Sequence, residues 1–370
     1  MKFNKKQEEA ISKVKTWFDN KEKPIFTIGG YAGTGKTTVA KAIIDNLDIA
    51  SKNIRFVAFT GKAANVMSSK GMKGATTIHS LIYVPHTLPN GSVCFSLKKR
   101  LKGVKLIVLD EASMVGREVL EDLLSFKIPI LALGDPGQLP PVASLRTNLL
   151  KNPDVLLEEI MRQDEGSGIV RFAEAVRNGH VPELSDNGKY GDEVKIMPVS
   201  KLTSSVDNFV KVVSKSQVIC GYNATRKSFN MAAKSTVFDK DPYHLEKGDK
   251  VICLENDRFC TANSDIGTLS LSNGTMGIMS SDAKKEKDDK FFTLLIPEIN
   301  AKFKAPLRYQ RFLKDRHELN FDLAYAITCH KSQGSEYDNL TVIDEPIGAK
   351  AEQWRYTAIT RAKKQLLYLV

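Results

Sequence analysis

The segment GYAGTGKT at residues 30–37 constrains the fold of this chain more than any other. It fits the pattern G-x4-G-K-[ST] and lies between the apolar run 24–28 and the helical stretch 38–47. Glycines let backbone N–H groups approach phosphate oxygens, the lysine supplies a cation to the β- and γ-phosphates, and the threonine can bind Mg²⁺. The segment therefore predicts a strand–loop–helix unit that binds a nucleoside triphosphate. The residues expected at the nucleotide are Gly33, Thr34, Gly35, Lys36, Thr37 and Thr38, with Thr37 also at the metal.

Short apolar runs separated by helix-like stretches continue this pattern through about residue 150. The runs are PIFTIGG, FVAFT, KLIVLDEA and PILALGD, and residues 4–19 have the apolar spacing of an amphipathic first helix. Continuous apolar runs of this length are typical of parallel strands that are covered on both faces. The first 150 residues are therefore expected to form a doubly wound α/β domain.

A second α/β alternation begins near residue 156 and is interrupted once. Between about 245 and 318 the chain changes to short β-like runs with Gly, Asn and a charged stretch, as in a small barrel, and the α/β pattern returns at 321–370. A chain of 370 residues is long enough for two or three domains. We therefore expect a second α/β domain with a β insertion.

Polar residues follow two of the predicted strands of the first domain. Asp110 and Glu111 end the run LIVLDEAS, and because successive side chains of a strand diverge, Asp110 can reach the metal while Glu111 faces the attacking water. Asp135 and Gln138 follow another strand, in a loop stiffened by Gly and Pro. Ligands of open α/β sheets bind at the carboxyl ends of the strands, so these residues are expected near the phosphates.

Charge and composition narrow the class of partner. The chain has 54 Lys and Arg against 43 Asp and Glu, for a net charge of +11, which favours a polyanion such as nucleic acid. Its five cysteines form no CxxC pair, so they suggest neither a disulfide framework nor a zinc site.

No signal-like start and no run of about 18 apolar residues is present, so we expect no membrane association and a cytoplasmic location. The absence of a separate carboxylate–lysine cluster disfavours a nuclease.

Eight motifs in order, GYAGTGKTT, AFTGKAA, TTIHSLI, VLDEASM, GDPGQLPP, EEIMRQ, ITCHKSQGSE and YTAITRAKK, resemble those of superfamily 1B DNA helicases, particularly the Dda-like and RecD-like branch. The resemblance implies an α/β fold with two RecA-like P-loop NTPase motor domains and ATP between them. It places domain 1A at 1–150, with an inserted pin or 1B hairpin at about 83–98. Domain 2A is expected at 151–245 and 319–370, and an SH3-like 2B insertion at 246–318.

The resemblance also implies roles in ATP hydrolysis. Gln7 occupies the position of the adenine-reading glutamine, and Gln138 that of the γ-phosphate sensor, beside Lys36 and Glu111 as catalytic residues. Arg162 and Arg361 match the two arginines that the second motor domain contributes. A guanidinium presents a planar fork of donors that suits the charge developing on phosphoryl oxygens.

Further residues lie in motifs that line the single-strand path in this family. They are Thr60, Lys62, Thr77, His79, Thr328, His330 and Gln333. Taken alone, His79 would more often be a structural histidine. The turn signal Asn90-Gly91 predicts a hairpin, on which Phe95 could either stack on a base or pack the pin.

The function implied by the resemblance is an ATP-dependent, Mg²⁺-requiring 5′–3′ DNA helicase of replication, recombination or repair. It would act as a monomer on single-stranded and fork DNA, with single-stranded-DNA-binding or replisome proteins as partners, in a bacterial or phage-infected cell. One alternative is a RecD-like DNA-dependent ATPase subunit of a larger recombination or repair complex. Another is a P-loop NTPase that acts on RNA or on a protein.

Overall fold

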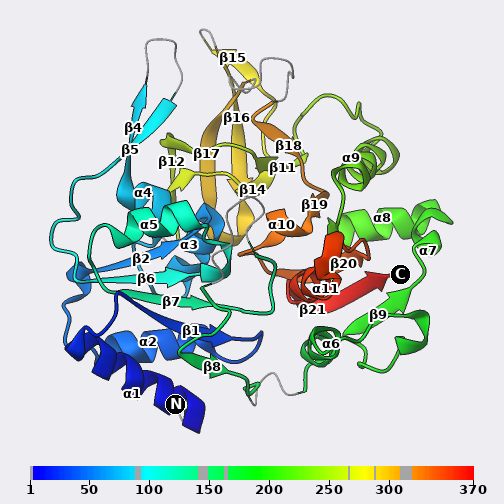
Figure 1. The fold of residues 1–370 in the computed structure, drawn as a ribbon. Coiled ribbons are helices and arrows are strands. Elements are labelled where there is room, and N and C mark those ends of the chain that lie inside the picture. The colour runs from blue at the N-terminus through cyan, green and yellow to red at the C-terminus, as the bar shows by residue number, and fades with distance from the viewer. Residues whose placement is uncertain are drawn as a thin grey trace. The chain divides into compact units, whose positions relative to one another are not determined.

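The computed structural model describes residues 3–87, 93–140, 149–161, 166–265, 267–286, 289–308 and 319–370 (Figure 1). The chain divides into two compact units, Met1–Glu165 and Gly166–Val370. Each is described by itself below. Among the residues described, no helix is both long enough and apolar enough to cross a membrane.

A parallel sheet with the strand order β3-β2-β6-β7-β1-β8 forms the centre of the first unit. The predicted strands are confirmed, since four of the six are the four apolar runs of the sequence. The strands are β1 Ile25–Gly30, β2 Ile54–Ala58, β3 Thr76–Thr77, β6 Leu106–Asp110, β7 Ile130–Gly134 and β8 Val155–Leu157. The helices are α1 Lys5–Asn20, α2 Lys36–Asn46, η1 Ser51–Asn53, α3 Gly61–Ser69, α4 Ile78–Ile82, η2 Ala112–Met114 and α5 Arg117–Leu124.

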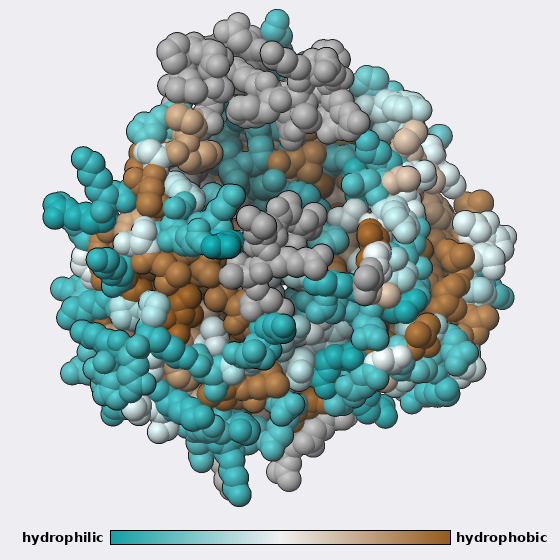
Figure 2. Space-filling model, viewed as in Figure 1, coloured by the Kyte–Doolittle hydropathy of each residue, from teal (hydrophilic) through white to brown (hydrophobic). Residues whose placement is uncertain are grey.

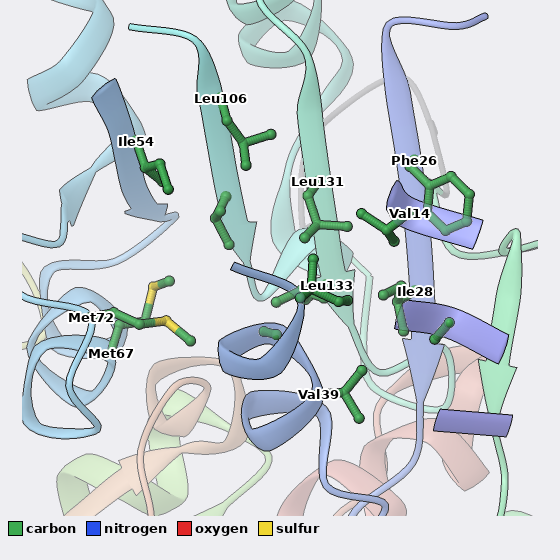
Figure 3. Packing of buried hydrophobic residues seen from close by; sticks show 14 of the residues in the cluster. Val14, Phe26, Ile28, Val39, Ile54, Met67, Met72, Leu106, Leu131 and Leu133 are labelled. Atoms are coloured by element: carbon green, nitrogen blue, oxygen red, sulfur yellow. The ribbon is translucent and has the colours of Figure 1, made fainter. Parts of the chain in front are cut away.

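Apolar side chains cover both faces of this sheet. On one face Val14 of α1 and Val39 of α2 pack against Ile28, Leu131 and other strand residues (Figure 3). On the other face α4 and α5 pack on β6 and β7. Each fully buried side chain of this size contributes roughly 1.5–3 kcal/mol. The face of the molecule shown in Figure 2 is mostly hydrophilic, with apolar side chains visible between the polar ones.

A β-hairpin follows α4 and extends away from the sheet of the first unit (Figure 1). Its antiparallel strands are β4 Tyr83–Thr87 and β5 Val93–Leu97. The hairpin lies in the range predicted from the sequence. Asn90 and Gly91 lie outside the described residues.

The second unit contains a parallel sheet with the order β19-β10-β20-β21-β9. Its strands are β9 Val194–Met197, β10 Gln217–Cys220, β19 Ala326–Thr328, β20 Tyr337–Ile343 and β21 Ala362–Leu369. Its helices are α6 Gly168–Arg177, η3 Leu184–Asp186, α7 Ser200–Thr203, α8 Val206–Lys215, α9 Asn223–Ala232, η4 Ala233–Val237, α10 Cys329–Ser332, η6 Gly348–Lys350 and α11 Ala351–Ile359. The fold class is thus α/β with two parallel sheets typical of RecA-like domains.

The β-rich region of the second unit has its own apolar core, which includes Phe292, Phe303 and Phe321. Its strands are β11 Lys250–Cys253, β12 Asp257–Ser264, β13 Gly267–Leu271, β14 Met276–Met279, β15 Lys284–Glu286, β16 Asp289–Ile296, β17 Ala301–Leu307 and β18 Phe321–Leu323, with η5 Pro297–Ile299. Strand β18 pairs with β11. The region therefore ends near residue 323 rather than at 318.

The boundary between the two α/β units also differs from the prediction. Strand β8 pairs in parallel with β1, and the backbone N–H of Met161 donates to the carbonyl of Gly33 at 2.9 Å. Residues 151–161 therefore belong to the first unit, which extends to Glu165 instead of ending at 150. An edge strand of three residues next to the phosphate loop is too short to be distinguished by its apolar pattern.

We expect Gly168→Ala to destabilise the second unit. A Cβ at Gly168, the first residue of α6, would lie 1.7 Å from the carbonyl oxygen of Tyr190. Alanine gains about 1 kcal/mol of helix propensity over glycine, but a backbone clash of this size costs more. Thermal unfolding should show a transition lowered by several degrees, whereas Gly166→Ala, where no atom lies within 4 Å, should leave it unchanged. An unchanged transition for Gly168→Ala would contradict the packing of α6 against residue 190.

Candidate nucleotide site

The loop between β1 and α2 has the backbone needed to hold phosphate groups. Gly33 and Gly35 have φ values of 76° and 78°, which glycine adopts without steric cost. A Cβ at Gly30 would lie 2.8 Å from the Cγ of Lys36 and from the Oγ1 of Thr34. The ammonium of Lys36 donates to the carbonyls of Gly30 at 2.6 Å and Tyr31 at 2.9 Å. The loop is thus wrapped around its own lysine.

The other predicted loop residues lie around this lysine. Thr34 is buried, and its hydroxyl donates to the carbonyl of Tyr31 at 2.8 Å. Thr37 and Thr38 are half-buried in the first turn of α2, where backbone N–H groups have no partner within the helix. Unpaired N–H groups and the positive end of the helix dipole favour an anion here.

Asp110 and Glu111 lie at the carboxyl end of β6. Burial raises the pKa of Asp110, an effect that the nearby charges of Lys36 and Lys70 partly oppose. One Asp110 carboxylate oxygen, Oδ1, accepts from the N–H of Glu111 at 2.9 Å. Glu111 has φ 52° and ψ 41°, a left-handed conformation that costs a residue with a Cβ about 1–2 kcal/mol. Strained backbone of this kind is concentrated at functional sites, and no local sequence pattern predicts it here.

Asp135 and Gln138 follow β7, the strand between β6 and β1. Asp135 is 1% exposed and accepts from the N–H of Gly137 at 2.9 Å and from the Nε2 of Gln138 at 3.4 Å. The Oε1 of Gln138 is buried and has no hydrogen-bond partner among the described residues. A buried amide oxygen without a partner costs about 1–3 kcal/mol, so a ligand that donates to it would be stabilising. The carboxyl ends of β1, β6 and β7 therefore bring together the residues predicted for phosphate chemistry.

Gln7 is fully buried against the phosphate loop. Its side chain completes a capping box with Asn4, and its Nε2 donates to the carbonyl of Thr34 at 3.1 Å and contacts the sulfur of Met161 at 2.9 Å. The structure thus places the candidate adenine-reading residue beside the loop. The structure also places Met161 beside the loop. The sequence did not predict this contact, and Met161 was notable there only as the residue before Arg162.

The donor set suits Mg²⁺. A hydroxyl from Thr37 and a carboxylate from Asp110 are hard oxygen ligands of the kind Mg²⁺ takes together with substrate phosphates and water. Asp110 is in no ion pair within the described part of the chain, and its charged form is disfavoured by burial. A divalent cation at this place would offset that cost.

Arg361 lies in the second unit and is 5% exposed. Its guanidinium donates to the carbonyls of Thr357 at 3.1 Å and Ser335 at 3.3 Å and to the hydroxyl of Thr360 at 3.1 Å. It makes no ion pair among the residues described. These partners are neutral and fix the orientation of a buried cation, which favours an anionic ligand. Arg162 lies outside the described residues.

The candidate DNA contacts of the first unit include two helix caps. The hydroxyls of Thr60 and Thr77 accept from the N–H groups of Ala63 at 3.2 Å and Ser80 at 3.1 Å, at the starts of α3 and α4. Lys62 is half-buried in the first turn of α3.

The two aromatic candidates of the first unit lie along one series of rings. The ring of His79 lies 6.3 Å from that of Phe59 and 5.3 Å from that of Tyr83. This packing is what the alternative interpretation of His79, as a structural histidine, predicts. Phe95 contacts the ring of Tyr83 at 6.4 Å and is still 54% exposed, so it has surface left for a base.

The candidate DNA contacts of the second unit offer less surface. Thr328 and Gln333 are 9% and 5% exposed. His330 is half-buried, and burial lowers its pKa. Two basic residues of the β-rich region are paired within the protein, Lys304 with Glu286 and Arg308 with Glu255 and Asp257.

Two family models match this chain. The profile of the AAA domain family matches residues 2–197, and that of the UvrD-like helicase C-terminal domain matches residues 323–370. The chain belongs to the AAA domain family, and its sequence is similar to helicases of the Dda/RecD type.

Two DNA helicases are similar to this chain in sequence. The chain is 25% identical over 366 residues to the ATP-dependent RecD2 DNA helicase of Deinococcus radiodurans, covering 92% of this chain and 46% of the relative. It is 32% identical over 167 residues to the ATP-dependent DNA helicase dda of Enterobacteria phage T4, covering 41% and 38%. It spans less than half the length of these two relatives.

Among solved structures, a Pif1 helicase from Bacteroides in complex with ADP-AlF3 and single-stranded DNA has a similar fold. Its TM-score is 0.60 at 19% identity, with 100% of this chain and 92% of the other covered. A structure concerning two Pif1 helicases at forked double-stranded DNA matches with a TM-score of 0.62 at 20% identity, with the same coverage.

We expect Asp110→Asn to raise the stability of the ligand-free chain at neutral pH. A group whose folded pKa is raised favours folding while it is protonated, and that contribution is lost as pH rises above the unfolded value. The asparagine keeps the acceptor for the N–H of Glu111 without the buried charge, for a gain of about 1 kcal/mol. Thermal unfolding at pH 7.5 should favour the variant, and the difference should shrink as pH falls below the raised pKa toward the ordinary value of an aspartate. A variant less stable than the parent at pH 7.5 would contradict the burial of this carboxylate.

Proposed function

We propose that this chain is an ATP-dependent DNA helicase that moves 5′ to 3′ on single-stranded DNA and separates duplex DNA by hydrolysing Mg·ATP. The observation that carries the proposal is the convergence at three neighbouring strand ends of the lysine-bearing loop, the Asp110–Glu111 pair and Gln138. The family supports the helicase assignment, and the resemblance to its 5′–3′ members supports the direction.

Each of these residues has a distinct part in hydrolysis. In the presence of ATP the Lys36 ammonium exchanges the carbonyls of its own loop for β- and γ-phosphate oxygens. Bound Mg²⁺ supplies charge neutralisation on the phosphates, and Thr37 and Asp110 are the residues that would hold it. Glu111 would orient the attacking water and take its proton. The Gln138 Oε1, which has no partner among the described residues, is suited to accept a hydrogen bond from that water.

Arg361 and Arg162 are the proposed link between hydrolysis and movement. Arg361 is oriented by Thr357, Thr360 and Ser335, and a pre-oriented guanidinium can stabilise the charge on the transferring phosphoryl group. Since Arg361 belongs to the second unit and the phosphate loop to the first, its grip on ATP would hold the units together until hydrolysis releases it.

Single-stranded DNA is the proposed track. The net charge of +11 favours a polyanion, and the exposed Phe95 offers a ring on which a base can stack. Several of the other candidate DNA-contact residues make hydrogen bonds or ring contacts within the protein. The oxygen of Thr60 accepts at the cap of α3, so contact with a phosphate oxygen would use its O–H as the donor. The O–H of Thr77 donates to the hydroxyl of Ser80 at 2.9 Å, so contact there would use the backbone.

We expect Lys36→Ala and Glu111→Gln to abolish ATP turnover for different reasons. Loss of the ammonium weakens binding of the triphosphate, whereas the glutamine keeps the binding site and loses the base. ATPase rates should fall at least about 100-fold in both variants, and only Glu111→Gln should bind a fluorescent ATP analogue as the parent does. Lys41→Ala, an exposed lysine of the same helix, is the matched control. ATPase near the parental rate in both variants would exclude this site.

The direction of movement is tested with duplexes that carry a single-stranded tail. We expect the purified chain with Mg·ATP to unwind a 5′-tailed duplex and to leave a 3′-tailed duplex intact, because a 5′–3′ motor meets the duplex only from the first. A fluorescent label on the displaced strand measures unwinding of each of the two duplexes. Preference for the 3′ tail would contradict the assigned direction.

A second candidate is a RecD-like DNA-dependent ATPase that works within a larger complex. It is supported by 22% identity to the RecBCD enzyme subunit RecD of Buchnera aphidicola. DNA-stimulated ATPase without unwinding by the chain alone would favour it. ATPase that DNA does not stimulate would instead favour an NTPase that acts on RNA or on a protein.

A further inference from the structure

Tyr83 lies at the joint where the β4–β5 hairpin meets the first unit. It is the first residue of β4 and the residue at which α4 ends. Its hydroxyl donates to the carboxylate of Asp122 on α5, and its ring lies 5.3 Å from the ring of His79 and 6.4 Å from the ring of Phe95. One side chain therefore contacts α4, α5 and the far strand of the hairpin.

The hydrogen bond between Tyr83 and Asp122 persists at ordinary pH. Burial, the Asp122 carboxylate and the charge of Glu118 together raise the pKa of Tyr83 to about 12. The phenol consequently keeps its proton and remains a donor to a charged acceptor. Hydrogen bonds of this kind are roughly twice as strong as those between neutral groups.

The second strand of the hairpin is also tied to α4. Lys98, directly after β5, donates from its ammonium to the carbonyls of Ser80 at 3.1 Å and Leu81 at 2.7 Å. Its backbone N–H donates to the carbonyl of Ile82 at 2.8 Å. A cation at the carboxyl end of a helix is favoured by the helix dipole. The hairpin is thus anchored at both strands.

The anchored hairpin presents an apolar face. Tyr83 pairs with Leu97 and Pro85 with Phe95, so these four residues lie on the same face. Phe95 and Leu97 are 54% and 37% exposed. A two-stranded hairpin is marginally stable by itself, so its direction depends on the anchoring contacts.

Helix α5 connects this joint to the candidate nucleotide site. The chain runs from Asp110 and Glu111 through η2 directly into α5, which carries Asp122. Leu120 and Leu123 of α5 are buried in the sheet core, so the helix is fixed to β6 and β7. The Tyr83–Asp122 contact therefore joins the hairpin to the helix that follows the catalytic carboxylates.

We propose that Tyr83 is a positioning residue whose hydrogen bond to Asp122 holds the hairpin against α5, so that the apolar face with Phe95 meets the duplex as the motor advances. This inference rests on the proposed helicase function. The contact is needed for strand separation and is not needed for hydrolysis of ATP, because neither residue lies at the phosphates.

The substitution Tyr83→Phe removes the hydroxyl and keeps the ring. We expect ATPase stimulated by single-stranded DNA to stay within about twofold of the parent and unwinding of a 5′-tailed fork to fall at least about fivefold, a loss in line with a hydrogen bond to a charged group. Adding Asp122→Leu to Tyr83→Phe should lower unwinding little further, since the two changes remove the same contact. Tyr243→Phe, at a tyrosine that is 76% exposed, is the matched control.

A spin label on Cys94 of β5 gives a readout that is independent of activity. Cys94 is exposed, Cys260 is half-buried and is replaced by serine in the labelled protein, and the other cysteines are buried. The label should become more mobile in Tyr83→Phe and remain unchanged in Tyr243→Phe.

The outcomes separate the inference from the proposed function. Unchanged unwinding by Tyr83→Phe, or equal loss of ATPase and unwinding, would overturn the positioning role. Unchanged label mobility would overturn the anchoring itself. A parent protein that hydrolyses ATP and unwinds no duplex would refute the helicase proposal, while the label experiment would still decide whether this contact fixes the hairpin.

Discussion

The phosphate loop between β1 and α2 is the constraint around which the rest of the first unit is arranged. Its backbone can curl around Lys36 only because Gly33 and Gly35 adopt positive φ and because Gly30 has no Cβ to collide with Lys36 and Thr34. Strand β1 lies between β7 and β8, with β6 beyond β7. Parallel pairing in this order delivers the residues after β6 and β7 to the edge where the loop begins. The order of the strands is therefore part of the site.

Both units hold a charge that the ligand-free chain accommodates at a cost. Asp110 is a half-buried carboxylate whose pKa is raised by desolvation, and Arg361 is a buried guanidinium with neutral partners. Desolvation of such groups lowers stability unless a charge of opposite sign is supplied. The left-handed Glu111 adds backbone strain beside Asp110. A bound metal ion and nucleotide would offset these costs. The costs therefore mark the residues at which the ligand-free chain is less stable than it would be without a ligand-binding role.

The motifs with a fixed local geometry could be predicted from the sequence. Three elements lie where predicted: the phosphate loop, the strand that ends in Asp110, and the first helix, which carries Gln7 in its first turn. Glycine placement and apolar periodicity predict them because both act over a few residues. Roles that depend on distant neighbours were less predictable. His79 was predicted as a DNA contact and packs between two rings, and Thr328 and Gln333 were predicted to contact DNA and are largely buried. Their surroundings come from residues far away in the chain.

By itself the sequence determined that this chain contains a phosphate-binding loop, alternating α/β structure, a β-rich insertion and a surplus of positive charge. Each of these features depends only on the local spacing of residues or on composition. Tertiary structure alone decided that residues 155–157 complete the first sheet, that Met161 contacts both Gln7 and the loop, and that Tyr83 joins the hairpin to α5. These contacts link residues separated by tens of positions or more. Such pairs form only when packing brings their elements together, and no local pattern records them.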